Sequence, residues 1–260
     1  MPHTDRTGGV AIRGLSAGYA GTVVLHTITA RFPLGGVTAI VGANGSGKST
    51  LLSAVAGVLP PVTGAVDLPG GTRPAFVVQR SAVPDRLPIT VRETVEMGRW
   101  ARRGPWRRLS DEDDEIVAES MRALGVSPLA RRRLSTLSGG QRQRVLVAQG
   151  IAQRSNVLLL DEPTAGLDGT AKDAIAAALA EEAARGAAVV HVTHDRADAA
   201  SADHCLVLSA GHLAGEGPPG TVLGGHVPDT ARRRATITDG SFPPSGVAVA
   251  DHGTTESGHA

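Results

Sequence analysis

Short runs of apolar residues alternate along this chain with longer segments in which apolar residues recur every three or four positions. Four runs are apolar at nearly every position, namely VTAIV (37–41), AFVV (75–78), NVLLL (156–160) and AAVVHV (187–192). Such runs are typical of strands buried on both faces, as in a parallel sheet covered by helices. Helical patterns lie between them, at residues 48–58, 90–99, 111–124, 140–153 and 170–185. The pattern therefore predicts an α/β domain.

The chain changes in character at about Pro228. Before it, CLVLS (205–209), a glycine-containing turn and a short second strand predict a β-hairpin. Beyond it, apolar periodicity is weak, and Gly, Pro, Thr, Ser and Asp are frequent. We therefore expect a folded domain over residues 8–227 and a loosely ordered tail over residues 228–260.

The predicted helix 111–124 carries signals at both ends. Ser110 is placed to cap its first turn, and Asp113, three residues later, completes a capping box. The first turn reads DEDDE, and negative charge there is stabilised by the positive end of the helix dipole. We interpret this acidic run as a solvated first turn rather than as a metal site, and Gly125 as the residue that ends the helix.

Composition narrows the function classes. The 260 residues suit one large domain, or one domain with an appendage, and their net charge of +1 gives no reason to expect a polyanion as partner. The single cysteine, Cys205, cannot form an internal disulfide, which favours a reducing compartment. The first residues lack the apolar core of a signal peptide, and glycines and prolines interrupt the charge-free run 49–66, which therefore cannot span a membrane. The nine histidines are scattered, without the paired spacing of a zinc site.

One segment, GANGSGKS (42–49), carries the strongest chemical signal. It matches G-x-x-x-x-G-K-[ST] without a mismatch and lies between a predicted strand and a predicted helix, as that pattern requires. Glycines let backbone N–H groups approach phosphate oxygens, and the start of the helix adds favourable partial charge. Lys48 can reach the β- and γ-phosphates, and the Ser49 hydroxyl can bind Mg²⁺. The segment predicts a nucleoside triphosphate site with these contacts: Gly42, Asn44, Gly45, Ser46, Gly47, Lys48, Ser49 and Thr50.

Two carboxylates follow the run 156–160. Asp161 is placed to hold Mg²⁺ beside the phosphate loop, and Glu162 could accept a proton from an attacking water or orient that water. A second glycine-rich segment, LSGGQ (137–141), opens the helix 140–153. It could be an ordinary capped helix, or it could bind a second anion at the helix N-terminus. One nucleotide needs only one such cradle, so this second one could face the nucleotide of another subunit.

The phosphate loop, LSGGQ and DEPTAGLD (161–168) together resemble the ATP-binding subunit of ABC transporters, over about residues 10–225. The resemblance implies a P-loop NTPase core of the RecA-like kind, with an N-terminal antiparallel β subdomain. It also implies an inserted α-helical signature subdomain at about 80–153. ATP and Mg²⁺ would be bound and ATP hydrolysed, with Asp161 and Glu162 in the Walker B element and Glu162 as the catalytic carboxylate.

The same resemblance assigns roles to residues that would look ordinary alone. Gln79 matches a glutamine that touches Mg²⁺ and senses the transmembrane partner, and His194 matches a histidine that contacts the γ-phosphate. Tyr19 falls where an aromatic ring stacks on adenine, and Asp168 matches the D-loop aspartate. The signature residues, which would contact the ATP of a partner chain, are Ser138, Gly139, Gly140 and Gln141.

The resemblance also implies partners. With one phosphate loop and one LSGGQ per chain, a complete pair of sites needs two chains, so we expect a head-to-tail homodimer that closes on ATP. The segment 79–153 would dock on an integral membrane permease at the cytoplasmic face of the membrane. The stretch 77–108 is similar to importers of zinc or manganese, in which an extracytoplasmic metal-binding protein delivers the cargo.

Two alternatives stay open. Siderophore and haem importers carry a stretch similar to 77–108, and they are the second candidate for the cargo. A soluble ABC ATPase that transports nothing is the rival from another class. Its usual marks are two cassettes in one chain or a long insertion, and the separation of 90 residues from Lys48 to Ser138 leaves no room for the latter.

Arginines and tryptophans are interleaved in the segment 100–108. This pattern could bind single-stranded nucleic acid, lie near lipid headgroups or the permease, or be a solvated surface loop with half-buried tryptophans. The family context favours surface or permease contact, and we expect no nucleic-acid partner. The residues concerned are Trp100, Arg102, Arg103, Trp106, Arg107 and Arg108.

Overall fold

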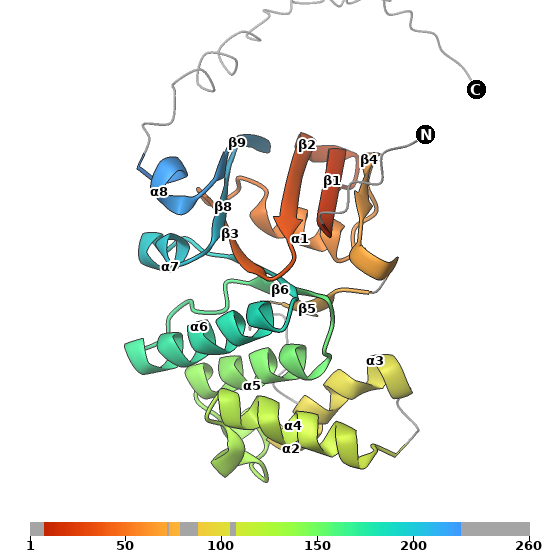
Figure 1. Ribbon diagram of the computed structural model, residues 1–260, viewed down its shortest axis with the longest axis vertical. Helices are drawn as coiled ribbons and strands as arrows, with labels where there is room; N and C mark the ends of the chain where they lie inside the picture. The colour runs from red at the N-terminus through yellow and green to blue at the C-terminus, as the bar shows by residue number, and fades with distance from the viewer. Residues whose placement is uncertain (1–7, 72, 79–87, 105–107, 225–260) are drawn as a thin grey trace, which may run out of the picture. The chain divides into compact units, whose positions relative to one another are not determined.

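The computed structural model describes residues 8–71, 73–78, 88–104 and 108–224. The predicted tail 228–260 and Gln79 lie outside the described residues. The described strands form two sheets (Figure 1). The smaller sheet is antiparallel, with the order β2-β1-β4, and contains β1 (Gly9–Tyr19), β2 (Thr22–Pro33) and β4 (Thr63–Asp67).

The larger sheet has the strand order β5-β6-β7-β3-β8-β9. Its neighbours pair in parallel from β5 to β8, and β9 pairs antiparallel with β8 as the second strand of the predicted hairpin. The strands of this sheet are β3 (Gly36–Gly42), β5 (Ala75–Val77), β6 (Val157–Asp161), β7 (Ala188–Val192), β8 (His204–Ser209) and β9 (His212–Gly217).

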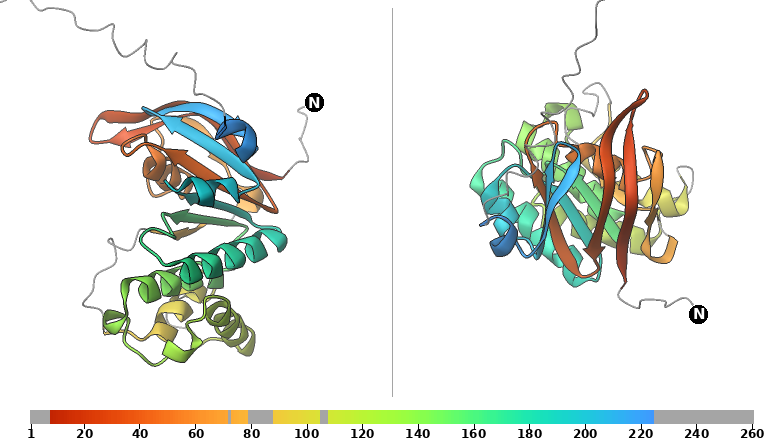
Figure 2. Two further views of the ribbon diagram at one scale, coloured as in Figure 1. Left: turned by 90° about the vertical axis from the view of Figure 1, so that its left-hand side faces the viewer. Right: turned by 90° about the horizontal axis from the view of Figure 1, so that it is seen from above.

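Helices lie on both sides of the larger sheet (Figure 2). The helix α1 contacts strands of both sheets, whereas α5 and α6 lie against the opposite face of the larger sheet. The α-helices are α1 (Lys48–Val55), α2 (Val91–Glu96), α3 (Trp100–Arg103), α4 (Asp111–Ala123), α5 (Gly139–Ala152), α6 (Gly169–Ala184), α7 (Arg196–Ala200) and α8 (Pro219–Val222). Short 3₁₀ turns cover Pro69–Gly71, Met97–Arg99, Ser127–Leu129 and Leu134–Thr136.

The strand β6 shows why the central runs are apolar at every position. Val157 and Leu159 point into a core shared with α1 and the smaller sheet. Leu158 and Leu160 point into a second core, which contains α5, α6 and the helices before them. The prediction of strands buried on both faces is therefore confirmed. The apolar pattern alone predicted helices on both faces, whereas the antiparallel subdomain that the resemblance implied fills one face together with α1.

Two predicted helices end earlier than their apolar pattern suggested. The helix predicted over 48–58 ends at Val55, since Gly57 turns the chain with a φ of +72°. The helix predicted over 90–99 ends at Glu96 and continues as the 3₁₀ turn Met97–Arg99. At Gly98 a Cβ atom would come within 2.4 Å of the carbonyl oxygen of Gln149 in α5, so a glycine is needed for this close packing.

The acidic first turn of α4 is only partly solvated, because Asp113 is buried, contrary to the prediction of a solvated turn. The capping box with Ser110 is confirmed, but the Asp113 side chain is 1% exposed and forms an ion pair with Arg99, which is 2% exposed. The Arg99 guanidinium also donates to the carbonyl oxygen of Ala152 at the end of α5, at 2.7 Å. Hydrogen bonds from Ser110 and Arg99, together with the charge of Arg99, outweigh the burial that opposes them and hold the pKa of the Asp113 carboxyl well below its usual range. This acidic residue therefore joins helices instead of facing water.

The described residues include no helix that is long and apolar enough to cross a membrane.

Candidate nucleotide site

The phosphate loop connects β3 to α1 at the carboxyl edge of the larger sheet. Gly47, the N-cap of α1, has a φ of +100°, and a Cβ atom there would lie 2.6 Å from Cδ2 of Leu25. Only glycine fits this position without strain. Among the described residues no side-chain cap is found at the N-terminus of α1, which leaves its first N–H groups open to a ligand. A helix N-terminus of this kind favours an anion.

Two side chains line the inside of the loop. Lys48 is 6% exposed, and its Nζ donates to the carbonyl oxygens of Gly42 at 2.9 Å and Ala43 at 3.0 Å. The Ser46 hydroxyl is buried, and among the described residues it has no hydrogen-bond partner. Buried polar groups are rarely left without a partner in folded proteins. A buried cation and an unused donor within a narrow backbone cradle fit a bound phosphate group.

Asp161, the last residue of β6, lies beside this loop. The Ser49 hydroxyl at the start of α1 donates to Oδ1 of Asp161 at 3.2 Å. Burial raises the pKa of the Asp161 carboxyl and the charge of Glu162 adds to that, whereas the Ser49 hydrogen bond and Lys48 act in the opposite direction. A hydroxyl and a carboxylate oxygen in contact are hard ligands that suit Mg²⁺.

Glu162 follows directly and adopts an unusual backbone conformation, with a φ of +50°. A left-handed conformation is uncommon for a residue with a side chain, and such residues gather at functional sites. Oε1 of Glu162 lies 3.8 Å from Nδ1 of His194, which comes shortly after the end of β7. The structure thus brings together two of the predicted catalytic side chains. Their predicted roles in hydrolysis stay a prediction.

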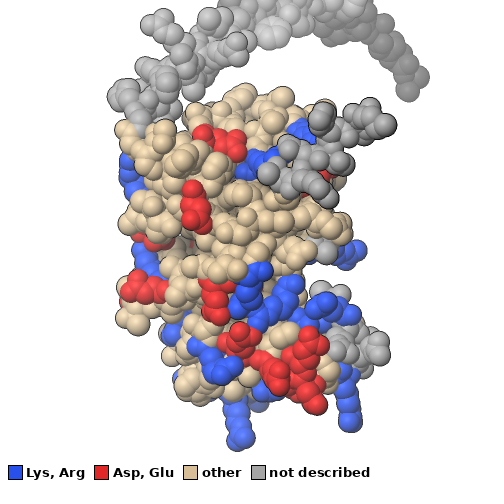
Figure 3. Space-filling model, in the orientation of Figure 1, with Lys and Arg blue, Asp and Glu red and all other residues tan. Residues whose placement is uncertain are grey.

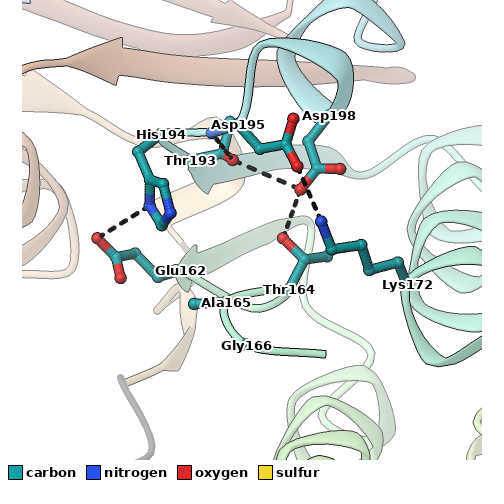
Figure 4. Close-up of a pocket in the computed structure, with 9 residues that line it drawn as sticks. All are labelled: Glu162, Thr164, Ala165, Gly166, Lys172, Thr193, His194, Asp195 and Asp198. Atoms are coloured by element: carbon teal, nitrogen blue, oxygen red, sulfur yellow. Dashed lines mark hydrogen bonds and ion pairs between the residues drawn. The ribbon is translucent and has the colours of Figure 1, made fainter. Parts of the chain in front are cut away.

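Figure 4 shows a small pocket beside this pair. It lies between the segment after β6, the segment after β7 and the helices α6 and α7. Its lining includes polar residues that sequence reasoning missed, namely Thr164, Lys172, Thr193, Asp195 and Asp198. The signal that could have found most of them is their place in the chain, since Thr164 ends DEPT (161–164), Thr193 and Asp195 lie within VTHD (192–195), and Asp198 follows it by three residues. Lys172, on α6, carries no such signal.

The LSGGQ segment forms a capped helix start. The Ser138 hydroxyl accepts the backbone N–H of Gln141 at 3.3 Å, and Oε1 of Gln141 accepts the N–H of Ser138 at 3.1 Å. Gly139 and Gly140 are the first residues of α5. In the part of the chain that the structure describes, no hydrogen bond or ion pair joins these four residues to the phosphate loop of the same chain.

The remaining predicted contacts are spread over the domain. Asp168 caps α6, with its Oδ1 accepting the N–H of Ala171 at 2.8 Å. Tyr19 ends β1 opposite Thr22, and it is 51% exposed, so its ring is open to a ligand. Gln79 lies outside the described residues, so its predicted contact with Mg²⁺ stays a prediction.

The surface charge gives no continuous basic face on the side drawn in Figure 3. Lys and Arg side chains lie interleaved with Asp and Glu over the helical part, while the part over the sheets carries few charges. Trp100 starts the short helix α3 and is 41% exposed, close to the half-buried position expected for a surface segment. Within the described ranges, no group of three or more His, Cys, Asp and Glu side chains could hold a metal ion.

Comparisons with known proteins agree with this geometry. A family model described as ABC transporter matches residues 25–165. The hemin import ATP-binding protein HmuV of Nocardia farcinica is 43% identical over 212 residues, which cover 77% of this chain and 72% of the relative. The zinc import ATP-binding protein ZnuC of Ruegeria pomeroyi is 38% identical over 214 residues, which cover 82% of this chain and 79% of the relative.

Solved structures show the same fold. A metal-chelate type ABC transporter in an inward-facing conformation superposes with a TM-score of 0.73 at 28% identity, covering 83% of this chain and 85% of that one. A dimeric bacterial ABC transporter cassette superposes with a TM-score of 0.69 at 25% identity, covering 81% of this chain and 98% of that one. The predicted fold class, a P-loop core with an antiparallel β subdomain and an inserted helical subdomain, is confirmed.

Proposed function

The chain belongs to the ABC transporter family, as the ATP-hydrolysing subunit of an importer, and from this premise we propose that it drives uptake of a metal chelate of the haem or siderophore class. Sequence reasoning favoured zinc or manganese. The higher identity to a hemin-import subunit, 43% against 38% for a zinc-import subunit, favours the chelate. The free divalent metal remains the second candidate because of the zinc relative.

The observation that carries the ATPase mechanism is the convergence of the phosphate loop, Asp161, Glu162 and His194 at one edge of the sheet. Lys48 and the first N–H groups of α1 bind the β- and γ-phosphates. Ser49 and Asp161 would hold Mg²⁺, which would supply positive charge to offset the charge that develops on the phosphates. Glu162 accepts a proton from the attacking water, and His194 contacts the γ-phosphate.

The site would be completed by a second copy of the chain. Ser138 and Gly139 form a helix N-terminus suited to an anion. Within the described residues, no hydrogen bond or ion pair joins this segment to the phosphate loop of the same chain. The dimeric cassette of the same fold supports a homodimer. In the proposed pair the two chains lie head to tail, so that each LSGGQ segment meets the nucleotide held by the other chain. The pair would bind a permease at the cytoplasmic face of the membrane, and an extracytoplasmic protein would deliver the cargo.

One variant tests the catalytic assignment. Glu162→Gln should still bind ATP and form a stable dimer on it, but hydrolysis should fall by about 100-fold or more, as expected when a general base is lost. Phosphate release and light scattering after gel filtration measure the two properties. The matched control is Glu181→Gln, which changes an acid on α6 whose side chain is 54% exposed and should leave both properties unchanged. Near-normal hydrolysis by Glu162→Gln would show that the assignment is wrong.

Cargo and class need separate experiments. With the permease and binding protein in vesicles, ATP-dependent uptake of haem or a ferric siderophore would support the chelate, whereas uptake of ⁶⁵Zn²⁺ alone would support the second candidate. Purification of native partners tests the class. A polytopic membrane protein is expected, and ribosomes or DNA in its place would favour the soluble ATPase that transports nothing.

A further inference from the structure

One carboxylate oxygen joins the two segments that carry Glu162 and His194. Oδ2 of Asp198, on α7, accepts a hydrogen bond from the Thr164 hydroxyl at 2.6 Å and one from the Thr193 hydroxyl at 3.5 Å (Figure 4). Thr164 lies two residues after Glu162, and Thr193 directly precedes His194. Asp198 therefore connects the segment after β6 with the segment after β7.

The two threonines are nearly buried, so water cannot readily replace the Asp198 carboxylate as the partner of their hydroxyls. Thr164 is 9% exposed and Thr193 is 3% exposed. A buried hydroxyl needs a partner, and an ionised acceptor makes a shorter and stronger hydrogen bond than a neutral one. The 2.6 Å distance to Thr164 is in the range of such charge-assisted bonds.

A second connection runs parallel to the first. Oδ2 of Asp195 binds Nζ of Lys172 on α6 at 2.8 Å, and its Oδ1 accepts the N–H of Ala197 at the start of α7. The backbone N–H of Asp195 donates to the Thr193 hydroxyl at 3.0 Å. The Thr193 oxygen thus accepts from Asp195 while its proton is directed to Asp198, which fixes the orientation of that hydroxyl. The residues on either side of His194, Thr193 and Asp195, are therefore both fixed by hydrogen bonds.

We propose that Asp198 is a positioning residue for ATP hydrolysis, which keeps Glu162 and His194 at one γ-phosphate by holding the Thr164 and Thr193 hydroxyls on one oxygen. The need for such a restraint follows from the backbone, because Glu162 has a φ of +50° and its carboxylate lies 3.8 Å from His194. Small displacements of a reacting group lower the rate steeply. The inference rests on the proposed roles of Glu162 and His194.

The position of Asp198 predicts which kinetic constant changes. In the described ranges, its carboxylate accepts hydrogen bonds from Thr164 and Thr193, and both lie outside the phosphate loop, which supplies the ground-state contacts with ATP. Asp198→Ala should therefore lower kcat about tenfold, equivalent to about 1.4 kcal/mol of activation free energy, while KM for ATP changes by less than about twofold. Asp198→Asn keeps an acceptor oxygen for both hydroxyls and should restore kcat to within about threefold of the unchanged protein.

A double-mutant cycle separates positioning from general stability. Thr164→Val removes the donor, while Thr164→Ser keeps it and should be nearly normal. Because Thr164 and Asp198 act through one hydrogen bond, Thr164→Val combined with Asp198→Ala should be no slower than Asp198→Ala alone. The matched control is Asp203→Ala, which removes another structural carboxylate, at the opposite end of β3 from the phosphate loop, whose Oδ2 accepts the N–H of Val37 at 2.8 Å. It should lower the melting temperature and leave kcat unchanged.

The results that overturn the inference are specific. A normal kcat for Asp198→Ala, an equal loss of kcat in Asp203→Ala, or additive losses in the cycle would each refute it. If Asp198→Ala does not fold, the comparison of Thr164→Val with Thr164→Ser decides, and equal rates for those two would refute it. Glu162→Gln is measured alongside. If that variant is inactive while Asp198→Ala is normal, only the positioning role fails, whereas an active Glu162→Gln means that the proposed catalytic assignment itself fails.

Discussion

The ion pair between Arg99 and Asp113 is the clearest test of what holds the helical subdomain together. Both side chains are almost fully buried, at 2% and 1% exposed, and Nε of Arg99 lies 2.8 Å from Oδ1 of Asp113. The guanidinium also reaches the carbonyl oxygen of Ala152. The pair therefore connects the start of α4, the end of the 3₁₀ turn before α3 and the end of α5. Asp113→Ala leaves the guanidinium buried without its carboxylate.

The size of the effect follows from this geometry. Removing one partner of a buried ion pair costs about 3–5 kcal/mol, because the remaining charge has lost water and has no opposite charge in its place. We expect Asp113→Ala to lower the free energy of unfolding by about 4 kcal/mol, a large part of the roughly 5–15 kcal/mol that stabilises a typical domain. The neighbouring Asp114 forms an ion pair with Arg92, but the two side chains are 48% and 45% exposed. Asp114→Ala should therefore cost less than about 1 kcal/mol.

Urea unfolding followed by tryptophan fluorescence measures the difference. The chain has two tryptophans, Trp100 and Trp106, and Trp100 directly follows Arg99, so the signal reports on this part of the chain. Asp114→Ala is the matched control, since it removes the same charge from the same helix turn. Similar unfolding midpoints for the two variants would refute the reasoning. A second check is the pair Arg99→Met and Asp113→Ala together, which should be more stable than Asp113→Ala alone, because no buried charge is left without a partner.

Two further changes test the phosphate loop and a buried histidine. Gly47→Ala should weaken ATP binding at least about tenfold, because φ is +100° and the new Cβ would meet Leu25. Binding of a fluorescent ATP analogue measures this effect. The control is Gly220→Ala, whose new Cβ would meet nothing within 4 Å. Burial lowers the pKa of His191 to about 4. Between about pH 6.5 and about pH 4 the unfolded state therefore binds a proton that the folded state does not bind. The free energy of unfolding should fall by up to about 3 kcal/mol as the pH drops through this range. In urea titrations His191→Gln should flatten this pH dependence and His212→Gln, an exposed control, should keep it; an unchanged dependence in His191→Gln would contradict the assignment.

The parts of the fold and site that the sequence predicts are those fixed by neighbouring residues. The phosphate loop needs glycine at position 47 because of the positive φ of the loop there and the close contact with the side chain of Leu25. The run 157–160 shows its burial directly, because each of its four residues faces one of two cores. In such segments local pattern and tertiary structure agree, which is the condition under which sequence reasoning succeeds.

The features that the sequence did not predict depend on residues that are distant in the chain. Asp113 looks like any acid in a first helix turn, and only Arg99, brought from another element, makes it a buried residue. Thr164 and Asp198 are 34 positions apart, and neither has a pattern of its own that indicates a hydrogen bond between them. A pair of this kind depends on how two loops and α7 pack, which a periodicity analysis does not contain.

The neighbouring acids Asp161 and Glu162 show how the chain resolves a conflict between strand geometry and chemistry. Successive side chains of an extended strand point to opposite faces of the sheet, yet Asp161 lies against Ser49 and Glu162 against His194, at the same edge. Pro163 disfavours the right-handed helical conformation at the residue before it, so the chain cannot leave β6 there by an ordinary helical turn. A φ of +50° at Glu162 ends the strand and redirects this side chain instead. The strain is tolerated because Thr164, two residues later, is held by Asp198, and the segment that orients Glu162 therefore depends on a contact with α7.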